Sequence, residues 1–246
     1  MSVSMPPVRG MTAAEARSLP DGRQPRHPQP GEPWHRRVAN VGLAALGIVL
    51  TLPLWMVIAA LVKLTSRGPV FYTQVRVGLD RRGATGGSAA DRGRRRVRNV
   101  GGRPFTIYKF RTMQVDAETR TGAVWATSND PRVTSVGRFL RASRLDELPQ
   151  LLNVLKGDMN IVGPRPERPS IFAELREQIP HYPLRQRAKP GITGLAQISQ
   201  AYDSSVDDVR RKVGFDLQYI RRASLRHDLA IMLRTIPVML FRKSGW

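Results

Sequence analysis

Uncharged residues fill one long stretch in the first third of the chain. From Val38 to Val62 there are 25 consecutive residues without a charge, preceded by two arginines and followed by Lys63. At about 1.5 Å per residue, a helix of this length exceeds the ~30 Å hydrocarbon core of a bilayer. The pattern predicts a membrane segment over residues 36–64. A buried helix of a soluble protein fits so long an uncharged run poorly.

Pro53 lies inside this apolar segment. A proline within a helix removes a backbone donor and clashes with the preceding turn, so it kinks or breaks the helix. Two topologies are open from these residues alone: a kinked helix that spans the bilayer, and a re-entrant helix-break-helix hairpin that returns both ends to one side. Basic residues flank both ends, and the positive-inside preference favours this arrangement only if both ends are cytoplasmic.

The rest of the chain has short strand and helix patterns. Two segments are predicted to be strands, the second because its apolar and polar residues alternate, and three segments have the pattern of helices. The last helical segment would suit either a membrane interface or the protein core. These elements predict an α+β fold with a short sheet and amphipathic interface helices. The strands are expected at Val70–Gln74 and Phe105–Arg111, and the helices after Pro149 (ending at Gly157), around Val209–Arg222 and over Asp228–Phe241.

Two further segments lack the apolar periodicity of a packed structure. Residues 1–33 hold seven of the 19 prolines, which predicts a disordered tail over residues 1–35. Residues 81–103 hold eight arginines and six glycines but one aspartate, which predicts a flexible insert able to contact anionic lipid. The expected organisation is therefore a tail, a membrane segment over 36–64, and one domain over 65–246 that contains the insert.

Charge and composition narrow the classes of partner. The chain has 40 Lys and Arg against 19 Asp and Glu, a formal net charge of +21, and no cysteine. The lack of cysteine excludes disulfides, thiolate zinc sites and a cysteine nucleophile. The positive charge predicts an anionic partner: nucleic acid, an anionic membrane surface or a phosphate-bearing substrate. A nucleic-acid-binding module would not explain the uncharged segment, so no nucleic-acid partner is expected.

Asp146 and Glu147 are the leading candidates for chemistry. They precede Pro149, which is tolerated only in the first turn of a helix, so both should lie at a helix N-terminus that favours anions. The simplest interpretation is a helix cap. The alternative is a Mg²⁺ and phosphate site, because Arg141 lies just upstream and the loop Gly163–Pro166 follows closely.

The stretch Arg141–Pro166 also resembles the signature of the bacterial sugar transferase family. These proteins are monotopic phosphoglycosyl transferases that load a sugar phosphate onto a polyprenyl-phosphate carrier. The resemblance covers about five-sixths of the chain and indicates the small, catalytic-domain form of the family. Five further motifs follow the family's order: Gln74–Gly78, Tyr108–Met113, Asn129–Thr134, Lys189–Gly194 and Phe215–Ile220.

The resemblance implies a two-step transfer. Asp146 would attack the β-phosphate of a nucleotide sugar, UDP-linked in particular, and form a covalent aspartyl-phosphosugar. Undecaprenyl phosphate, the polyprenyl acceptor, would then attack this intermediate and so initiate exopolysaccharide or another cell-surface glycan. Asp146 and Glu147 would hold Mg²⁺. The resemblance also implies a bacterial inner-membrane protein with a cytoplasmic active site and a hairpin that breaks at Pro53.

The same resemblance assigns the phosphate- and substrate-binding residues. Two features depart from the family pattern: residues 82–99 look like an insertion, and Arg144 stands where serine or threonine is common. A catalytically inactive membrane scaffold of the same fold is the alternative, but the intact Asp146-Glu147 pair argues against it. The residues assigned to the site are Arg141, Arg165, Lys109, Arg111 and Asp216.

Overall fold

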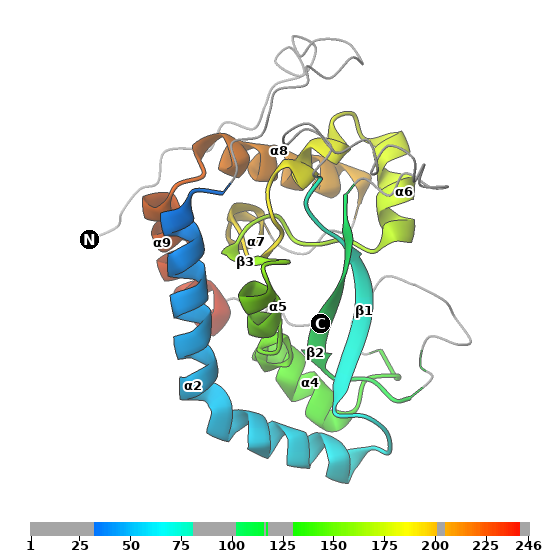
Figure 1. Cartoon of the computed structure of the whole chain (residues 1–246). Helices are drawn as coiled ribbons and strands as arrows, with labels where there is room; N and C mark the ends of the chain where they lie inside the picture. Colours follow the sequence, from blue (N-terminus) through cyan, green and yellow to red (C-terminus); the bar gives the residue numbers. More distant parts are fainter. Residues whose placement is uncertain (1–31, 81–101, 116, 118–129, 201–204, 242–246) are drawn as a thin grey trace, which may run out of the picture.

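The computed structural model describes residues 32–80, 102–115, 117, 130–200 and 205–241. Most of the expected tail and of the Arg/Gly-rich insert lies outside these residues. The described chain is an α+β arrangement in which helices surround two small sheets, as the sequence predicts (Figure 1). The helices and strands are α2 (Trp34–Thr65), β1 (Phe71–Val77), β2 (Pro104–Phe110), α4 (Ser135–Ala142), η1 (Leu145–Glu147), α5 (Gln150–Lys156), β3 (Asn160–Val162), α6 (Pro169–Gln178), η2 (Tyr182–Arg187), β4 (Gly191–Thr193), α7 (Leu195–Ser199), α8 (Val206–Arg222) and α9 (Leu225–Phe241), of which η1 and η2 are 3₁₀-helices.

Helix α2 contains the whole uncharged segment. It has 32 residues and Pro53 lies inside it, and within the described part of the chain it alone is long and apolar enough to cross a membrane. Figure 1 shows that α2 bends, so that its two halves run in different directions along the molecule. The bend has a direct cause in Pro53, which cannot donate the helical hydrogen bond and crowds the turn before it.

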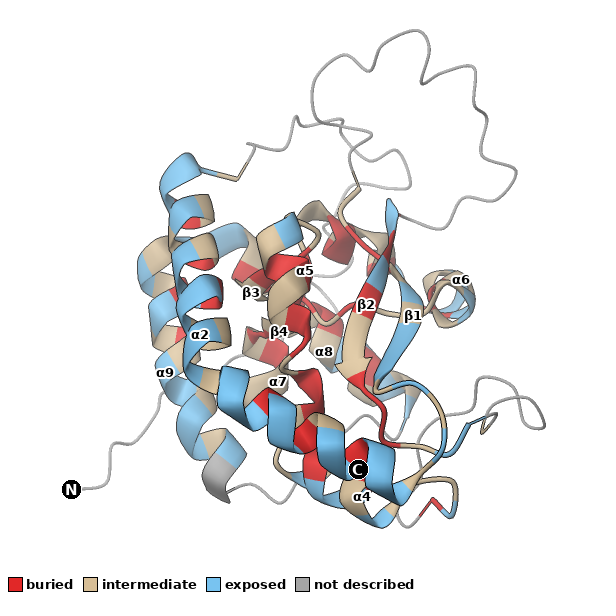
Figure 2. Cartoon of the chain, turned by 60° about the horizontal axis from the view of Figure 1, so that its bottom comes forward, coloured by how far each residue is buried: buried red, intermediate tan, exposed pale blue. Residues whose placement is uncertain are grey.

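The two faces of α2 have different surroundings. Trp55, Ile58 and Val62 are buried against Phe110 of β2 and Leu140 of α4. These residues recur every three or four positions, so they form one stripe along the helix. The opposite face is apolar yet exposed (Figure 2), which is the pattern expected of a helix that faces lipid rather than water. Its most exposed large residues are Trp34, Val38, Val49, Leu50, Met56 and Leu64.

The two sheets each contain two strands. Strands β1 and β2 are antiparallel with Tyr72 opposite Lys109, which confirms the two strands predicted at Val70–Gln74 and Phe105–Arg111. Strands β3 and β4 are parallel and only three residues long, and the sequence pattern does not predict them. They approach very closely at Gly163, just after β3, where an added Cβ would lie 2.3 Å from the carbonyl oxygen of Lys189. Glycine is required there because no side chain fits.

The leucine-rich segment after Pro149 forms α5, which packs between α2 and the β1–β2 sheet. Val154 is fully buried beside Ala44 of α2 and Ile107 of β2. Gly157 ends the helix in the left-handed conformation, with φ of 86°, as the Gly157-Asp158 pair predicts. Each fully buried side chain of this kind stabilises the fold by roughly 1.5–3 kcal/mol. Helix α5 thus holds α2 and the β1–β2 sheet together.

Helices α8 and α9 pack on the other side of β3 and β4. Both agree with the predicted helical segments. The sequence left open whether the last helix, α9, faces the protein core or a membrane interface. One of its faces is in the core, because Ile231 is buried against Tyr219 and Val162, whereas Leu233 and Ile236 are more than half exposed. Helix α9 therefore contributes to the core and also presents an apolar outer face. Helices α4 and α6 are additional elements that the hydrophobic pattern alone does not predict.

Candidate active site

Asp146 and Glu147 lie in the 3₁₀ turn η1, between α4 and α5. Arg144 has φ of 55°, a left-handed conformation that ends α4 and reverses the chain into this turn. Both carboxylates are buried. The N-cap position of α5 is occupied by Pro149, and no side chain caps the helix through a hydrogen bond. Neither carboxylate is therefore a helix N-cap, and the capping interpretation is wrong.

Glu147 is neutralised by two cations from distant parts of the chain. Its Oε1 atom accepts hydrogen bonds from Lys109 Nζ at 2.7 Å and from Arg165 Nη2 at 2.8 Å. Burial would raise the pKa of Glu147, but the attraction of Arg165 and Lys109 outweighs it and holds that pKa well below the usual range. Glu147 is thus a permanent anion that fixes the two cations in place.

Asp146 has a different environment from its neighbour. Lys109 Nζ lies 3.9 Å from Asp146 Oδ2, which is an ion pair but too long for a hydrogen bond. Burial raises the pKa of Asp146, the attraction of Lys109 opposes this only in part, and repulsion by Glu147 adds to it. The two adjacent carboxylates of this turn therefore differ. The charge of Glu147 is balanced by two hydrogen-bonded cations, whereas Asp146 is the more basic of the two.

Arg141 joins this group from the last turn of α4. Its Nε atom donates to Thr112 Oγ1 at 2.8 Å, just beyond the end of β2. Its charge is one of the attractions that partly oppose the burial-driven rise in the pKa of Asp146. The structure thus brings together Asp146 and Glu147 with the predicted Arg141, Lys109 and Arg165. Three cations around two carboxylates leave net positive charge, which suits a phosphate-bearing ligand.

The loop Gly163–Pro166 is held through its backbone, which orients Arg165. The carbonyl oxygens of Pro164, Arg165 and Pro166 each accept a hydrogen bond, from Gly191 N at 3.0 Å, Arg185 Nη2 at 3.0 Å and Arg76 Nη1 at 3.1 Å, respectively. With its backbone fixed in this way, the side chain of Arg165 reaches Glu147. A loop that holds its cation before substrate arrives needs no rearrangement to bind it.

Asp216 acts on this loop indirectly. Its carboxylate accepts from Arg185 Nε at 2.6 Å, and Arg185 in turn holds the Arg165 carbonyl. Asp216 is 1% exposed, so it is buried beneath the loop and supports it. Arg185 is a residue that the sequence analysis misses, because no motif marks it. Glu167 is another: surrounding cations, Lys212 and Arg185 foremost, outweigh its burial and lower its pKa to about 2.

Arg111 does not join the site, contrary to the sequence expectation. Its guanidinium donates to the carbonyl oxygens of Ser66 and Arg67 at 2.8 Å each, and to Ser66 Oγ at 2.8 Å. Ser66 and Arg67 directly follow α2, and the same guanidinium lies 3.5 Å from the carbonyl oxygen of Val62 in the last turn of that helix. The C-terminus of a helix carries partial negative charge, which favours a cation there. Arg111 therefore secures the C-terminal end of α2.

The two carboxylates are also the candidate ligands for a metal ion. Among the described residues no group of three or more His, Cys, Asp or Glu could hold a metal. Mg²⁺ is commonly bound by one or two carboxylates together with substrate phosphates and water, so Asp146 and Glu147 are a sufficient protein contribution. Because Glu147 already accepts from two cations, Asp146 has the more available oxygens of the two.

Comparison with known proteins gives consistent matches over most of the chain. A family model described as "Bacterial sugar transferase" matches residues 32–86 and 87–242. A UDP-glucose:undecaprenyl-phosphate glucose-1-phosphate transferase of Caulobacter vibrioides is 41% identical over 207 residues, covering 83% of this chain and 69% of that protein. The exopolysaccharide production protein ExoY of Rhizobium meliloti is 36% identical over 225 residues, covering 86% of this chain and 88% of that protein.

A longer relative shows how much of such proteins the chain represents. A UDP-glucose:undecaprenyl-phosphate glucose-1-phosphate transferase of Klebsiella pneumoniae is 39% identical over 213 residues, which are 86% of this chain but 41% of that protein. The chain therefore spans less than half of the length of several relatives that it matches. The part in common contains α2, both sheets and the Asp146-Glu147 turn.

Proposed function

The chain belongs to the bacterial sugar transferase family, and from this premise we propose that it transfers a sugar 1-phosphate from a UDP-sugar to undecaprenyl phosphate. Relatives at 39–41% identity carry names for this reaction. The single observation that carries the proposal is the pairing of an available, basic carboxylate, Asp146, with a neighbour whose charge is already neutralised. An inactive scaffold would have no need to keep such a carboxylate buried among cations.

Asp146 is the proposed nucleophile of the first step. One of its oxygens attacks the β-phosphorus, the bond between that phosphorus and the bridging oxygen breaks, and UMP leaves with the electron pair. The enzyme then carries an aspartyl-phosphosugar, and total charge is conserved without any proton transfer. In the second step an oxygen of undecaprenyl phosphate attacks the same phosphorus and releases the Asp146 carboxylate. A covalent intermediate divides one difficult exchange into two easier displacements.

The surrounding cations stabilise the charge that spreads over the transferring phosphoryl group. Arg165 and Arg141 present planar forks that can each hold two phosphate oxygens, and Lys109 adds a point charge between the two carboxylates. Phosphoryl transfer requires mainly positioning and charge stabilisation, which these residues supply. Bound Mg²⁺, held by Asp146 and Glu147, would neutralise further charge on the phosphates.

The two steps predict a covalent adduct that can be trapped. Wild-type protein mixed with Mg²⁺ and a UDP-sugar that carries a radiolabelled sugar should retain label and release UMP in the absence of acceptor. Addition of undecaprenyl phosphate should then discharge the label into lipid. UMP release that requires the acceptor would contradict the two-step route and favour direct transfer in a ternary complex. Testing several UDP-sugars in the same assay identifies the preferred donor.

We further propose that α2 is a re-entrant hairpin that places both of its ends, and the active site, on the cytoplasmic side of the bacterial inner membrane. The bend of α2, its exposed apolar face and the exposed apolar face of α9 support this proposal. Because the chain has no cysteine, His35→Cys and Arg67→Cys report on the two ends separately. In intact cells both variants should be protected from a membrane-impermeant thiol reagent. Labelling at one end alone would mean that α2 spans the bilayer.

A further inference from the structure

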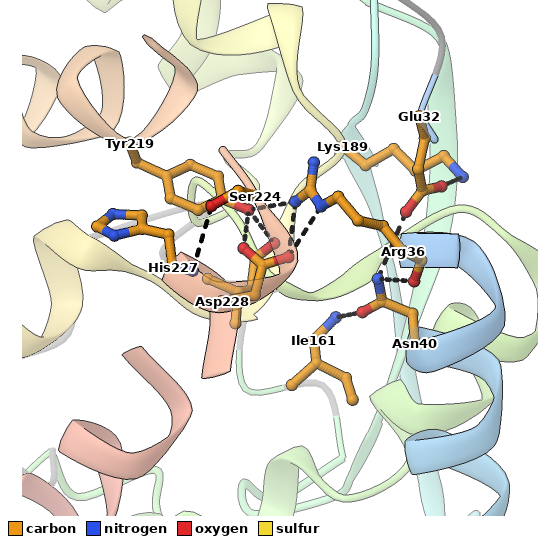
Figure 3. Close-up of polar contacts among 10 residues, drawn as sticks. Glu32, Arg36, Asn40, Ile161, Lys189, Tyr219, Ser224, His227 and Asp228 are labelled. Atoms are coloured by element: carbon orange, nitrogen blue, oxygen red, sulfur yellow. Dashed lines mark hydrogen bonds and ion pairs between the residues drawn. The ribbon is translucent and has the colours of Figure 1, made fainter. Parts of the chain in front are cut away.

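A second cluster of buried polar side chains lies between the membrane helix and the C-terminal helices. Arg36 of α2, Tyr219 of α8 and Asp228 of α9 are 8%, 2% and 3% exposed, respectively. Arg36 donates from Nε and Nη2 to Asp228 Oδ2, at 3.0 and 2.7 Å, and also from Nη2 to the Tyr219 hydroxyl at 2.9 Å (Figure 3). These three residues, named here the anchor cluster, join elements that are far apart in the sequence.

The anchor cluster reaches the backbone of β3 through the Tyr219 hydroxyl. That hydroxyl lies 2.9 Å from the carbonyl oxygen of Val162 and 2.9 Å from Asp228 Oδ1. It accepts from Arg36, and the single proton of the hydroxyl is shared between these two acceptor oxygens. Val162 is the last residue of β3 and immediately precedes the loop Gly163–Pro166. The cluster therefore holds the point at which this loop begins.

A second contact connects α2 to the same strand. Asn40 lies one turn after Arg36, and its Nδ2 atom donates to the carbonyl oxygen of Arg36 at 2.8 Å. Its Oδ1 atom accepts from the backbone N–H of Ile161 at 2.8 Å (Figure 3). Helix α2 thus holds Ile161 directly, through Asn40, and holds the next residue, Val162, through Arg36 and the Tyr219 hydroxyl. Both polar residues lie on the side of α2 that faces the protein.

The loop that follows is anchored at both of its ends. The anchor cluster holds Val162 at the start, and Arg185 and Arg76 hold the Arg165 and Pro166 carbonyls beyond it. Arg165 lies between these anchors and reaches Glu147. The anchors at the start of the loop, namely the cluster at Val162 and the Asn40 contact at Ile161, include residues of α2. The orientation of Arg165 is thereby connected to the placement of α2.

Stability alone gives little reason for such a cluster. Burial of an ion pair costs several kcal/mol of desolvation per ion, and apolar residues of similar volume often stabilise a fold equally well or better. Apolar residues, however, could not hold a particular carbonyl group at a fixed distance, because their contacts are not directional. The cluster is therefore better suited to holding the backbone at Val162 in place than to stabilising the fold.

We propose that Arg36, Tyr219 and Asp228 are positioning residues that fix the Arg165 loop relative to the membrane helix. This proposal rests on the proposed function, because Arg165 is assigned there to the transferring phosphoryl group. When α2 lies in the membrane, the cluster fixes β3 relative to α2, and the loop that follows β3 carries Arg165. Among the described residues, no hydrogen bond or ion pair joins the cluster to Asp146 and Glu147, the two carboxylates named here the dyad. The effect of the cluster on the reaction is therefore indirect.

The sharpest test is Tyr219→Phe, which removes the hydroxyl and keeps the ring. The full chain would be studied in nanodiscs that contain anionic phospholipid, by hydrogen exchange of the loop amides at Gly163, Arg165 and Glu167, and by the kinetics of UMP release. We expect faster exchange at these amides and a fall in kcat of about tenfold or more, since a displacement of ~1 Å can cost about 10²-fold in rate. KM for the UDP-sugar should change less than kcat.

Thr51→Val is the control, because it also removes a side-chain hydroxyl, here a part-buried one of α2. Thr51 Oγ1 donates to the carbonyl oxygen of Gly47 at 2.6 Å and accepts from Trp55 Nε1 at 3.0 Å, so both contacts lie within α2 and neither involves β3 or the loop. The control should leave loop exchange and kcat within about twofold of wild type. Unchanged exchange in Tyr219→Phe, or faster exchange with unchanged kcat, would overturn the proposal. If wild-type protein releases no UMP, the proposed function fails, and loop exchange alone decides whether the cluster holds the loop.

Discussion

The two buried charge clusters of this protein differ in how their charges are balanced. In the anchor cluster one cation meets one anion, and the Tyr219 hydroxyl completes the set. Around the dyad, Lys109, Arg141 and Arg165 surround two carboxylates, and one of these, Asp146, is only loosely paired. A cluster that balances itself can hold structure but has little affinity for a ligand. A cluster with surplus positive charge and an available carboxylate can accept a phosphate and attack it.

From this difference between the two clusters we expect the largest loss of activity when Asp146 is changed. Asp146→Asn removes the attacking charge while keeping the shape, so UMP release should fall by roughly 10³-fold or more. The folded state should not lose stability, because the raised pKa means that the ionised carboxylate costs folding energy at neutral pH. Radiolabel trapping and thermal unfolding measure the two outcomes. An adduct that forms normally in Asp146→Asn would place the nucleophile elsewhere.

In the anchor cluster a single change should affect stability strongly. Asp228→Ala leaves Arg36 buried without its carboxylate, and we expect a loss of about 3 kcal/mol or more in the free energy of unfolding. The double variant Arg36→Met with Asp228→Leu removes both charges and should recover most of that loss. Denaturant unfolding in detergent compares the variants. A double variant as unstable as Asp228→Ala would show that the charges themselves stabilise the fold.

At the dyad, the geometry of a cation should matter beyond its charge. Arg165→Lys keeps the charge and loses the fork, so kcat should fall by about 10²-fold with the fold intact. The carboxylate of Glu147 would still pair with Lys109. Steady-state UMP release measures the fall in kcat, and thermal unfolding checks that the variant is still folded. Wild-type activity in Arg165→Lys would remove this side chain from phosphate binding.

Arg111 should behave as part of the helix anchor and not as part of the site. Arg111→Lys would lose most of the hydrogen bonds to the carbonyls at the end of α2. We expect a loss of about 1–2 kcal/mol in stability and a change in kcat of less than about threefold at a temperature where the variant is folded. A large loss of kcat at unchanged stability would restore Arg111 to the substrate site.

The smallest predicted effect is a shift in the pH dependence of adduct formation. Only ionised Asp146 attacks, so the rate falls as pH drops through its pKa, and the raised pKa places this decline above the ordinary value of 3.8. Glu147→Gln removes the neighbouring negative charge and frees Lys109 to interact with Asp146. The decline should therefore move to lower pH in this variant. An identical pH profile in both proteins would mean that Glu147 does not influence Asp146.

Several parts of the molecule are determined by local sequence. The 25-residue uncharged run predicts an apolar helical segment, and Pro53 within it predicts a kink or a break in that segment. Leucines at helical spacing, ended by Gly157, specify α5. The alternation before Arg111 specifies β2. Such features depend on neighbours within a few residues, so a pattern along the chain records them directly.

The partners of the charged residues were decided by the tertiary structure. Sequence motifs place Arg111 and Asp216 with the site, yet packing turns Arg111 toward the end of α2 and buries Asp216 beneath the Arg165 loop. Arg36 and Asp228 are 192 positions apart, and no local pattern pairs them. Charged side chains are long and can reach several partners, and which one they meet depends on where distant elements pack. Adjacent Asp146 and Glu147 acquire opposite pKa shifts for the same reason, because the folded chain brings Lys109 and Arg165 within hydrogen-bonding distance of Glu147, whereas Lys109 stays 3.9 Å from Asp146.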